Sequence, residues 1–301
     1  MEIKRVLVTG SNGFIGSLIV NHLLNQTNVQ VFGTSRGRNR NEQLNPKFYL
    51  NLNLLDLLGL NSCLENIRPN IVVHCAAISQ VDLCEKNQEL CRNVNIEATK
   101  IISNYCKKFY AKIVFLSTDF VFNGSNKWED EESQPNPQSI YAKSKYECEK
   151  FIQCTNSNWV IIRPVLVYGF SPVAARPNIF SWVYNSVVSG IQINVVDDQM
   201  RTPTFVGDVI RLVALSINSH QIGVYNLGGE NVISVFEFAM EIERQLRIDH
   251  KFVVPTKSAH TLGGELRPIN SCFKNLKVKR DFNLCPIGIT EGVAKSIKMI
   301  K

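Results

Sequence analysis

Hydrophobic residues recur in two alternating patterns along this chain. Short apolar runs, typical of strands buried on both faces of a parallel sheet, alternate with stretches in which apolar residues recur every three to four positions, as in helices. The apolar runs fall at residues 6–8, 29–34, 47–50, 71–75, 112–116 and 159–163. This alternation predicts an α/β fold, a doubly wound parallel sheet of the Rossmann class with right-handed crossovers.

The helical stretches between these runs predict helices at residues 56–67, at 83–107, from 140 onward, at 206–217 and at 234–247. After Pro164 the elements become shorter and prolines more frequent. We therefore predict a first domain over residues 1–165, completed by segments within 204–228. A smaller lobe over residues 166–301 would be interleaved with it.

A glycine-rich turn follows the first apolar run, with Gly10, Gly13 and Gly16 in a GxxGxxG spacing. Strand, turn and helix together would aim the free N–H groups and the positive end of the helix dipole at one point, which suits a pyrophosphate. We predict that the first domain binds a dinucleotide here, through Gly10, Asn12, Gly13, Phe14, Ile15 and Gly16.

The second apolar run leads into the polar sequence SRGRNR. In a dinucleotide fold a carboxylate at this place bonds the ribose 2′-hydroxyl, whereas arginine accommodates a 2′-phosphate. Ser35, Arg36 and Arg38 stand here without a carboxylate, which favours NADP(H) over NAD(H). The alternative is a solvated basic loop. Further cofactor contacts are predicted at Ala76 and Ala77, where small residues leave room for the ligand, and at Asn95.

A second group of polar residues predicts carbonyl reduction. Thr118 follows the fifth apolar run, and the sequence YAKSK places Tyr141 and Lys145 four residues apart on one helix face. A lysine ammonium beside a phenol favours the phenolate, so we expect Lys145 to lower the pKa of Tyr141. Thr118 would hold the substrate oxygen, and Tyr141 would donate the proton. Lys145 would bond the nicotinamide ribose.

Composition adds three exclusions and two local expectations. The net charge is +7, yet the lysines are dispersed, so nucleic-acid binding is not expected. Nine cysteines without a CxxC pair indicate reduced packing thiols and no metal site. No secretory signal or apolar run of about 18 residues occurs, so we expect a cytoplasmic protein without membrane contact. We expect His74 in the core and residues 129–132 in a solvated acidic turn.

The motifs GSNGFIG, HCAA, STDFVF, YAKSK, RPVLVYG, RTPTFVGDV and LRPINS together resemble those of the extended short-chain dehydrogenase/reductases. Within that family the chain is most similar to the dTDP-4-dehydrorhamnose reductase branch. The resemblance implies Thr118, Tyr141 and Lys145 as the catalytic set and a substrate lobe after residue 165. The substrate contacts that it implies are Asp119, Phe120, Val121, Arg201 and Arg267. It also implies a homodimer.

The chain departs from that branch at three positions. Phe120 replaces a tyrosine, Leu166 replaces a common tryptophan, and Asn53 replaces a common aspartate. The motifs are also similar to those of the regulatory β subunit of methionine adenosyltransferase, which binds NADP and a partner protein. We expect an NADPH-dependent reductase of a nucleotide-linked 4-keto-6-deoxy sugar. The alternatives are a regulatory subunit and a sugar-nucleotide epimerase/reductase.

Overall fold

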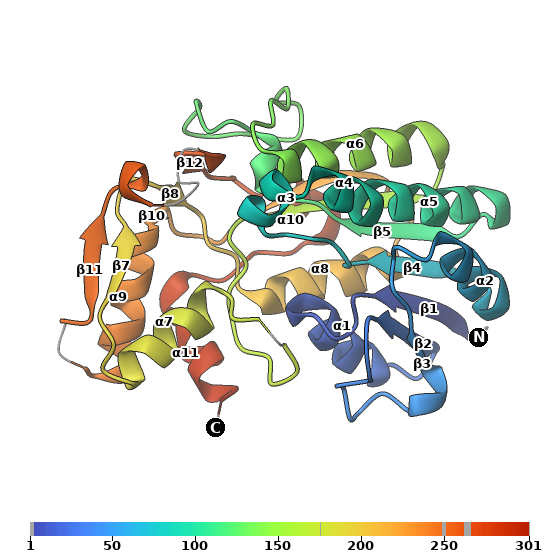
Figure 1. The fold of residues 1–301 in the computed structure, drawn as a ribbon, viewed down its shortest axis with the longest axis horizontal. Helices are drawn as coiled ribbons and strands as arrows, with labels where there is room; N and C mark the ends of the chain where they lie inside the picture. The colour runs from blue at the N-terminus through green and yellow to red at the C-terminus, as the bar shows by residue number, and fades with distance from the viewer. Residues whose placement is uncertain (1–2, 175, 249–250, 262–265, 301) are drawn as a thin grey trace.

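The central feature of the fold is a seven-stranded parallel sheet (Figure 1). The computed structural model describes residues 3–174, 176–248, 251–261 and 266–300. The strand order is β3-β2-β1-β4-β5-β6-β9. The strands are β1 (Lys4–Thr9), β2 (Val29–Ser35), β3 (Tyr49–Asn51), β4 (Ile71–His74), β5 (Lys112–Leu116), β6 (Trp159–Pro164) and β9 (Gly223–Leu227). The order reverses between β1 and β4, so the carboxyl ends of these strands form the crevice where open α/β sheets bind ligands.

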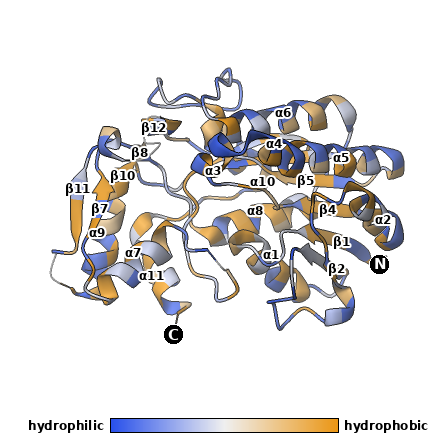
Figure 2. Ribbon diagram, viewed as in Figure 1, coloured by the Kyte–Doolittle hydropathy of each residue, from blue (hydrophilic) through white to orange (hydrophobic). Residues whose placement is uncertain are grey.

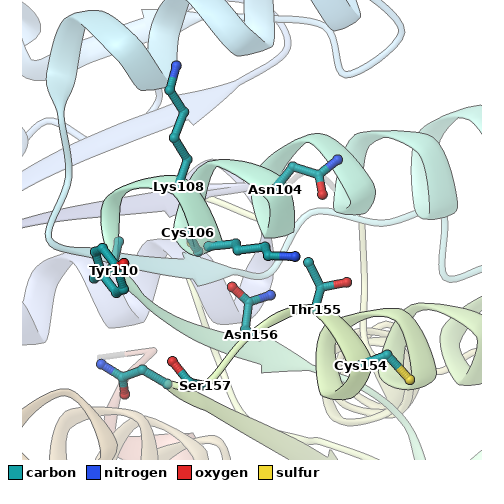
Figure 3. Close-up of a pocket in the computed structure, with 11 residues that line it drawn as sticks. Asn104, Cys106, Lys108, Tyr110, Cys154, Thr155, Asn156 and Ser157 are labelled. Carbon is teal, nitrogen blue, oxygen red and sulfur yellow. The ribbon is translucent and has the colours of Figure 1, made fainter.

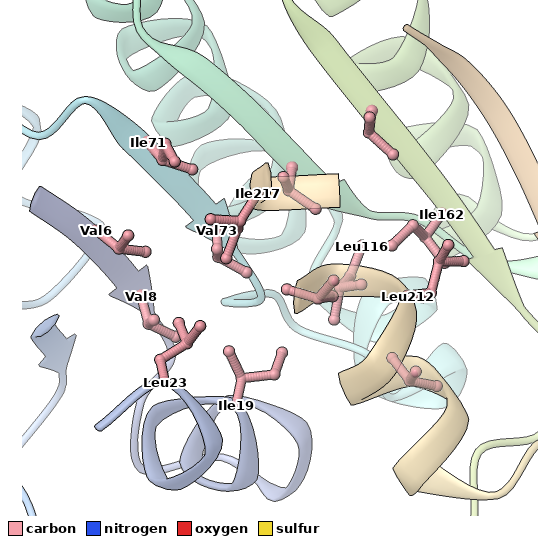
Figure 4. Close-up of a cluster of buried hydrophobic side chains, with 14 of the residues drawn as sticks. Val6, Val8, Ile19, Leu23, Ile71, Val73, Leu116, Ile162, Leu212 and Ile217 are labelled. Atoms are coloured by element: carbon pink, nitrogen blue, oxygen red, sulfur yellow. The ribbon is translucent and has the colours of Figure 1, made fainter. Parts of the chain in front are cut away.

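Alternate residues of each central strand face opposite helix layers. Val6 and Val8 of β1 pack with Ile19 and Leu23 of α1 (Phe14–Leu24), together with α8 (Val206–Asn218), in the cluster drawn in Figure 4. Leu7 packs on the other face, which is covered by α2 (Leu57–Ile67), α5 (Ala98–Phe109) and α6 (Ile140–Thr155). Burial on both faces explains why the strands are continuously apolar, and the predicted doubly wound sheet is confirmed.

Two predicted elements differ from the structure. The third strand begins at Tyr49, because residues 46–48 form a 3₁₀ turn (η1, Pro46–Phe48). The Asn45 side chain caps this turn by accepting a hydrogen bond from the Lys47 N–H. The single helix predicted over residues 83–107 is divided into α3 (Val81–Lys86), α4 (Gln88–Cys91), a π-helical turn η2 (Arg92–Glu97) and α5. The interruption falls at Asn87, whose φ of −135° and ψ of 69° are not helical.

A second lobe lies beside the carboxyl ends of the sheet, at the left in Figures 1 and 2. It contains the short sheets β10-β8-β12 and β11-β7 and the helices α7 (Ile179–Val188), α9 (Val235–Leu246) and α11 (Ile289–Lys298). Its strands are β7 (Ile193–Val196), β8 (Met200–Arg201), β10 (Ile233–Ser234), β11 (Val253–Thr256) and β12 (Asn270–Ser271), and α10 (Leu276–Phe282) returns the chain to β9. The predicted helix at 234–247 is α9, which begins with a capping box between Ser234 and Glu237. The division of the chain at residue 165 stays a prediction.

The acidic segment 129–132 is not simply a solvated turn. Glu129 is buried, and its carboxylate accepts a hydrogen bond from Asn126. The carboxylate of Glu131 accepts one from the backbone N–H of Asn226 on β9 (2.8 Å). These contacts hold the loop against the sheet, so the expectation of a solvated turn is wrong for Glu129.

Candidate active site

The glycine turn has the close packing that its spacing predicts. Gly10 adopts φ +71°, and a Cβ there would lie 2.9 Å from the backbone nitrogen of Ala76. A Cβ on Gly16 would lie 2.3 Å from the Gly10 carbonyl oxygen, so α1 can approach the turn only with glycine at this position. Gly13 is exposed and precedes the first turn of α1, whose leading N–H groups have no acceptor within the helix. The turn therefore offers N–H donors to an anion.

The arginine-bearing loop after β2 is tied directly to this turn. Ser35 Oγ accepts a hydrogen bond from the Asn12 N–H (3.0 Å), and the Asn12 side chain donates to the Arg38 carbonyl (2.9 Å). Tyr49, which sequence reasoning missed, donates its hydroxyl to the Gly37 carbonyl (2.6 Å). Arg36 and Arg38 are exposed beside the glycine turn, where their guanidinium groups are available to a ligand.

These residues fit a dinucleotide that carries a 2′-phosphate. The turn supplies N–H donors at the start of α1, and no carboxylate occupies the end of β2 to bond a free 2′-hydroxyl. Ala76 and Ala77 follow β4 and are half-buried beside the turn, so they border the same crevice. The Asn12 side chain holds the arginine-bearing loop in place, since it bonds the Arg38 carbonyl, the Arg40 N–H and the Tyr49 hydroxyl.

The three predicted catalytic residues are brought together at the carboxyl end of β5. Thr118, Tyr141 and Lys145 are all buried. Burial raises the pKa of the Tyr141 phenol well above its usual value, and the nearby Thr118 side chain opposes this only in part. The prediction that Lys145 lowers the pKa of Tyr141 is wrong, because the pKa is raised by burial and Lys145 is not among the groups that shift it. A neutral phenol of this kind is a proton donor at neutral pH.

Lys145 lies in an enclosed site between α6 and β5. Its Nζ is 4.0 Å from the centroid of the Phe115 ring, an arrangement that favours the cation. Burial nevertheless lowers the pKa of Lys145 to about 8, against the opposing effects of Cys148 and Glu149. His74, on β4, bonds Thr9 and Thr99 and has a pKa lowered to about 3 by burial, so the prediction of a core histidine is confirmed.

An apolar surface surrounds the Tyr141 ring. Phe120 packs against it edge-on, with centroids 6.4 Å apart, and Val81 and Leu266 belong to the same cluster. Next to Leu266, Arg267 reaches across from the second lobe to Asp82, with Nη2 and Oδ2 3.5 Å apart. Phe120 and Arg267 thus stand where the two lobes meet near the phenol.

Three residues predicted to contact substrate instead serve internal contacts. The Asp119 carboxylate is buried and accepts hydrogen bonds from Thr118 (3.1 Å) and Ser271 (2.5 Å). Val121 is fully buried in a core cluster with Phe122, Val165 and Phe273. The Arg201 guanidinium is buried, and its N–H groups donate to Gln199 and to the carbonyls of Met200, Pro268 and Ile269.

Asn95, predicted to contact the cofactor, has an internal role as well. Its side chain accepts from the N–H of Ile78 (2.8 Å) and donates to the Ser144 hydroxyl (3.0 Å). It is therefore buried at the junction between α6 and the segment that follows β4. The π-helical turn η2 carries Asn95 at this junction.

Sequence reasoning missed a buried ion pair beneath the catalytic residues. Glu149 on α6 pairs with Arg163 on β6 and also accepts a hydrogen bond from Ser117. A signal was present in the sequence: Tyr141, Lys145 and Glu149 recur every four residues along one helix face.

One large cavity lies away from these residues, at the amino ends of β5 and β6. It has a volume of about 660 Å³ and is bordered by the last turns of α5 and α6, including Asn104, Tyr110, Thr155 and Asn156 (Figure 3). A second cavity of about 20 Å³ is bordered by Phe120 and Arg267. This smaller cavity is bordered by Phe120 and Leu266, which pack in one cluster with Tyr141, so chemistry and not volume identifies the site.

The remaining sequence expectations concern metal, membrane and thiols. Among the residues described, no group of three or more His, Cys, Asp or Glu side chains could hold a metal ion. No helix in the described part of the chain is long and apolar enough to cross a membrane. All nine cysteines are free thiols, and most are buried, as predicted.

The fold and the crevice place the chain in the Rossmann class of α/β proteins. A model of the RmlD substrate binding domain family matches residues 4–301, and the chain belongs to this family. It is similar to a dTDP-4-dehydrorhamnose reductase from Bacillus anthracis solved in complex with NADP, with a TM-score of 0.85 and 26% identity over 99% of this chain and 100% of that one.

Two further similarities frame the functional alternatives. A dTDP-4-dehydrorhamnose reductase structure from Clostridium acetobutylicum has a TM-score of 0.84 and 28% identity, covering 98% of this chain and 99% of that one. The methionine adenosyltransferase 2 subunit beta of Danio rerio is 26% identical over 275 residues, which cover 89% of this chain and 82% of the relative. The suspected relationship to both groups is thus confirmed.

Proposed function

We propose that this protein is an NADPH-dependent reductase of a nucleotide-linked 4-keto-6-deoxy sugar. The observation that carries the proposal is the burial of Thr118, Tyr141 and Lys145 together at the carboxyl end of β5, in the crevice that the glycine turn also faces. The NADP complex of the similar Bacillus anthracis reductase supports the choice of cofactor.

The residues divide the reaction among them. When bound, NADPH supplies a hydride to the carbonyl carbon. Thr118 bonds the carbonyl oxygen, and Tyr141, neutral because its pKa is raised, donates the proton to that oxygen as negative charge develops. Lys145 bonds the nicotinamide ribose. Arg36 and Arg38 bind the 2′-phosphate, and the N–H groups at the start of α1 bind the pyrophosphate.

The second lobe binds the substrate. Residues 1–165, with segments within 204–228, form the cofactor-binding part, and residues 166–301 supply most of the substrate contacts. Arg267 is suited to the negatively charged diphosphate, and the apolar surface of Phe120 and Val81 is suited to the deoxygenated carbon of the sugar.

The test is NADPH oxidation with dTDP-, UDP- and GDP-linked 4-keto-6-deoxyhexoses, measured by absorbance. We expect turnover with one nucleotide series and none with the corresponding 4-hydroxy sugars. Absence of turnover with every keto sugar, by protein that binds NADPH normally, would contradict the proposal.

A second candidate function is favoured by the similarity to methionine adenosyltransferase 2 beta subunits. In that case the chain would bind NADP and a catalytic partner, without turnover of its own. Co-purification with a methionine adenosyltransferase, and a change in the kinetics of that enzyme on mixing, would support this candidate. Neither effect is expected for a free-standing reductase.

A further inference from the structure

A buried ion pair lies directly beneath the proposed catalytic residues. The Glu149 and Arg163 side chains are 0% and 3% exposed. Arg163 donates from Nε to Glu149 Oε1 (2.9 Å) and from Nη2 to Oε2 (2.6 Å), a bidentate arrangement. The Ser117 hydroxyl donates to the same Oε1 atom. One carboxylate therefore accepts three hydrogen bonds from two other segments.

Those segments are the ones that carry the proposed chemistry. Ser117 immediately precedes Thr118 at the end of β5, and its N–H bonds the Ile162 carbonyl on β6 (2.7 Å). Glu149 lies one helical turn beyond Lys145, which lies one turn beyond Tyr141. The Arg163 guanidinium also lies over the Phe122 ring, 5.2 Å from its centroid, at the end of the segment that contains Thr118.

Fold stability alone does not explain the presence of this pair. Taking two charges out of water is unfavourable, and apolar residues of similar volume often replace a buried ion pair without loss of stability. A buried pair at this junction therefore needs another explanation. Its directional hydrogen bonds can fix a helix against a strand end more precisely than apolar contacts do.

We propose that Glu149 is a positioning residue, which through Ser117 and Arg163 holds α6 in register with the end of β5 so that the Tyr141 phenol meets Thr118. This inference rests on the proposed function, in which Tyr141 donates a proton to a substrate oxygen held by Thr118. Glu149 itself touches neither substrate nor cofactor and acts through the residues that do.

Glu149 also has an electrostatic effect on Lys145. The groups that face Lys145 come from four elements. They are Cys148 and Glu149 on α6, His74 at the end of β4 with Cys75 just after it, Cys91 on α4, and the Phe115 ring on β5. Burial lowers the pKa of Lys145, and the Glu149 carboxylate opposes that lowering. Removing the carboxylate lowers the pKa further, so the ammonium is lost at a lower pH.

The test compares Glu149→Gln, the double variant Glu149→Met with Arg163→Met, and Asp208→Asn as a matched control. Asp208 is also a buried carboxylate, but it bonds Arg211 and the Ile287 N–H on the other side of the sheet. The measurements are kcat, KM for NADPH, thermal stability, and the pH titration of Lys145 by NMR of protein labelled with ¹³C at the lysine ε-carbon. The Lys145 signal is assigned from Lys145→Arg.

We expect kcat to fall by about 10²-fold in Glu149→Gln while KM for NADPH stays within about threefold, because misplacement by about 1 Å has this effect. The midpoint of the Lys145 titration falls in Glu149→Gln, which removes a negative charge beside the ammonium, and moves less in the double variant, which removes one negative and one positive charge. The double variant recovers stability but not kcat, and Asp208→Asn changes neither kcat nor the midpoint.

Wild-type kcat in a folded double variant overturns the positioning role, even if Glu149→Gln alone fails to fold. An unchanged Lys145 midpoint in folded Glu149→Gln also contradicts it. An equal midpoint shift in Asp208→Asn overturns it as well. If the wild-type protein reduces no keto sugar, the proposed function fails. The Lys145 titration, which needs neither substrate nor cofactor, then decides the positioning role alone.

Discussion

The replacement of Tyr141 by phenylalanine removes the proposed proton donor and little else. The ring is 8% exposed and packs edge-on against Phe120, and phenylalanine preserves that contact. The lost hydroxyl lies near the Thr118 side chain, and its removal is expected to change stability by about 1 kcal/mol or less. The variant is therefore expected to fold and to bind NADPH.

The effect on turnover is much larger. A positioned general acid contributes about 10²- to 10⁴-fold to the rate, which corresponds to about 2.7 to 5.4 kcal/mol of activation free energy. Affinity for NADPH is expected to change by less than about threefold, because the proposed phosphate contacts, at the glycine turn and at Arg36, are away from the phenol. The assay is kcat from NADPH oxidation with the keto sugar, paired with calorimetric binding of NADPH.

Tyr168→Phe is the matched control. Tyr168 is buried in the second lobe, and its hydroxyl has no hydrogen-bond partner among the described residues. Its removal leaves kcat unchanged and does not lower the melting temperature, because a buried hydroxyl without a partner is unfavourable. Turnover by Tyr141→Phe within twofold of wild type, in protein that binds NADPH normally, would refute the proton-donor role.

Three further predictions concern the cofactor turn, the arginine loop and pH. Arg36→Ala weakens NADPH binding by about 10- to 100-fold and NADH binding little, because a charged hydrogen bond to the 2′-phosphate is lost; equal losses in calorimetry would contradict that contact. Gly16→Ala destabilises the protein by about 1–3 kcal/mol in urea unfolding, because its Cβ would meet the Gly10 carbonyl oxygen; an unchanged midpoint would contradict the close packing. Activity falls as pH rises through about 8, where the Lys145 ammonium is lost. Burial also lowers the pKa of Lys112 to about 8, but Lys112 lies at the opposite end of β5. Lys112→Met is therefore expected to keep the alkaline fall in activity. Loss of that fall in Lys112→Met would show that Lys112, and not Lys145, causes it.

The sheet and the catalytic helix could be predicted because their signals are local. Continuous apolar runs report burial on both faces, and Tyr141 and Lys145 share a helix face by spacing alone. The glycine turn could also be predicted, since its backbone geometry leaves no room for a side chain at Gly10 or Gly16. In each case the sequence neighbours are also the spatial neighbours.

The partners of buried charges could not be predicted, because they are distant in the chain. Arg201 is held by the Pro268 carbonyl and Asp119 by Ser271, and nothing near either residue in the sequence indicates this. Both were expected at the substrate because the family resemblance implied it, and the resemblance carries no information about these partners. The break at Asn87 was also missed, because the helical pattern continues across this residue although its φ and ψ are not helical.

The most direct test of the reductase assignment is isotope transfer from NADPH that carries deuterium at both hydrogen positions of the reactive carbon of the nicotinamide ring. The product sugar nucleotide is analysed by NMR after turnover in ordinary water. The account predicts deuterium at carbon 4 of the sugar, in one configuration. Product without deuterium at that carbon, or a mixture of both configurations, would contradict it.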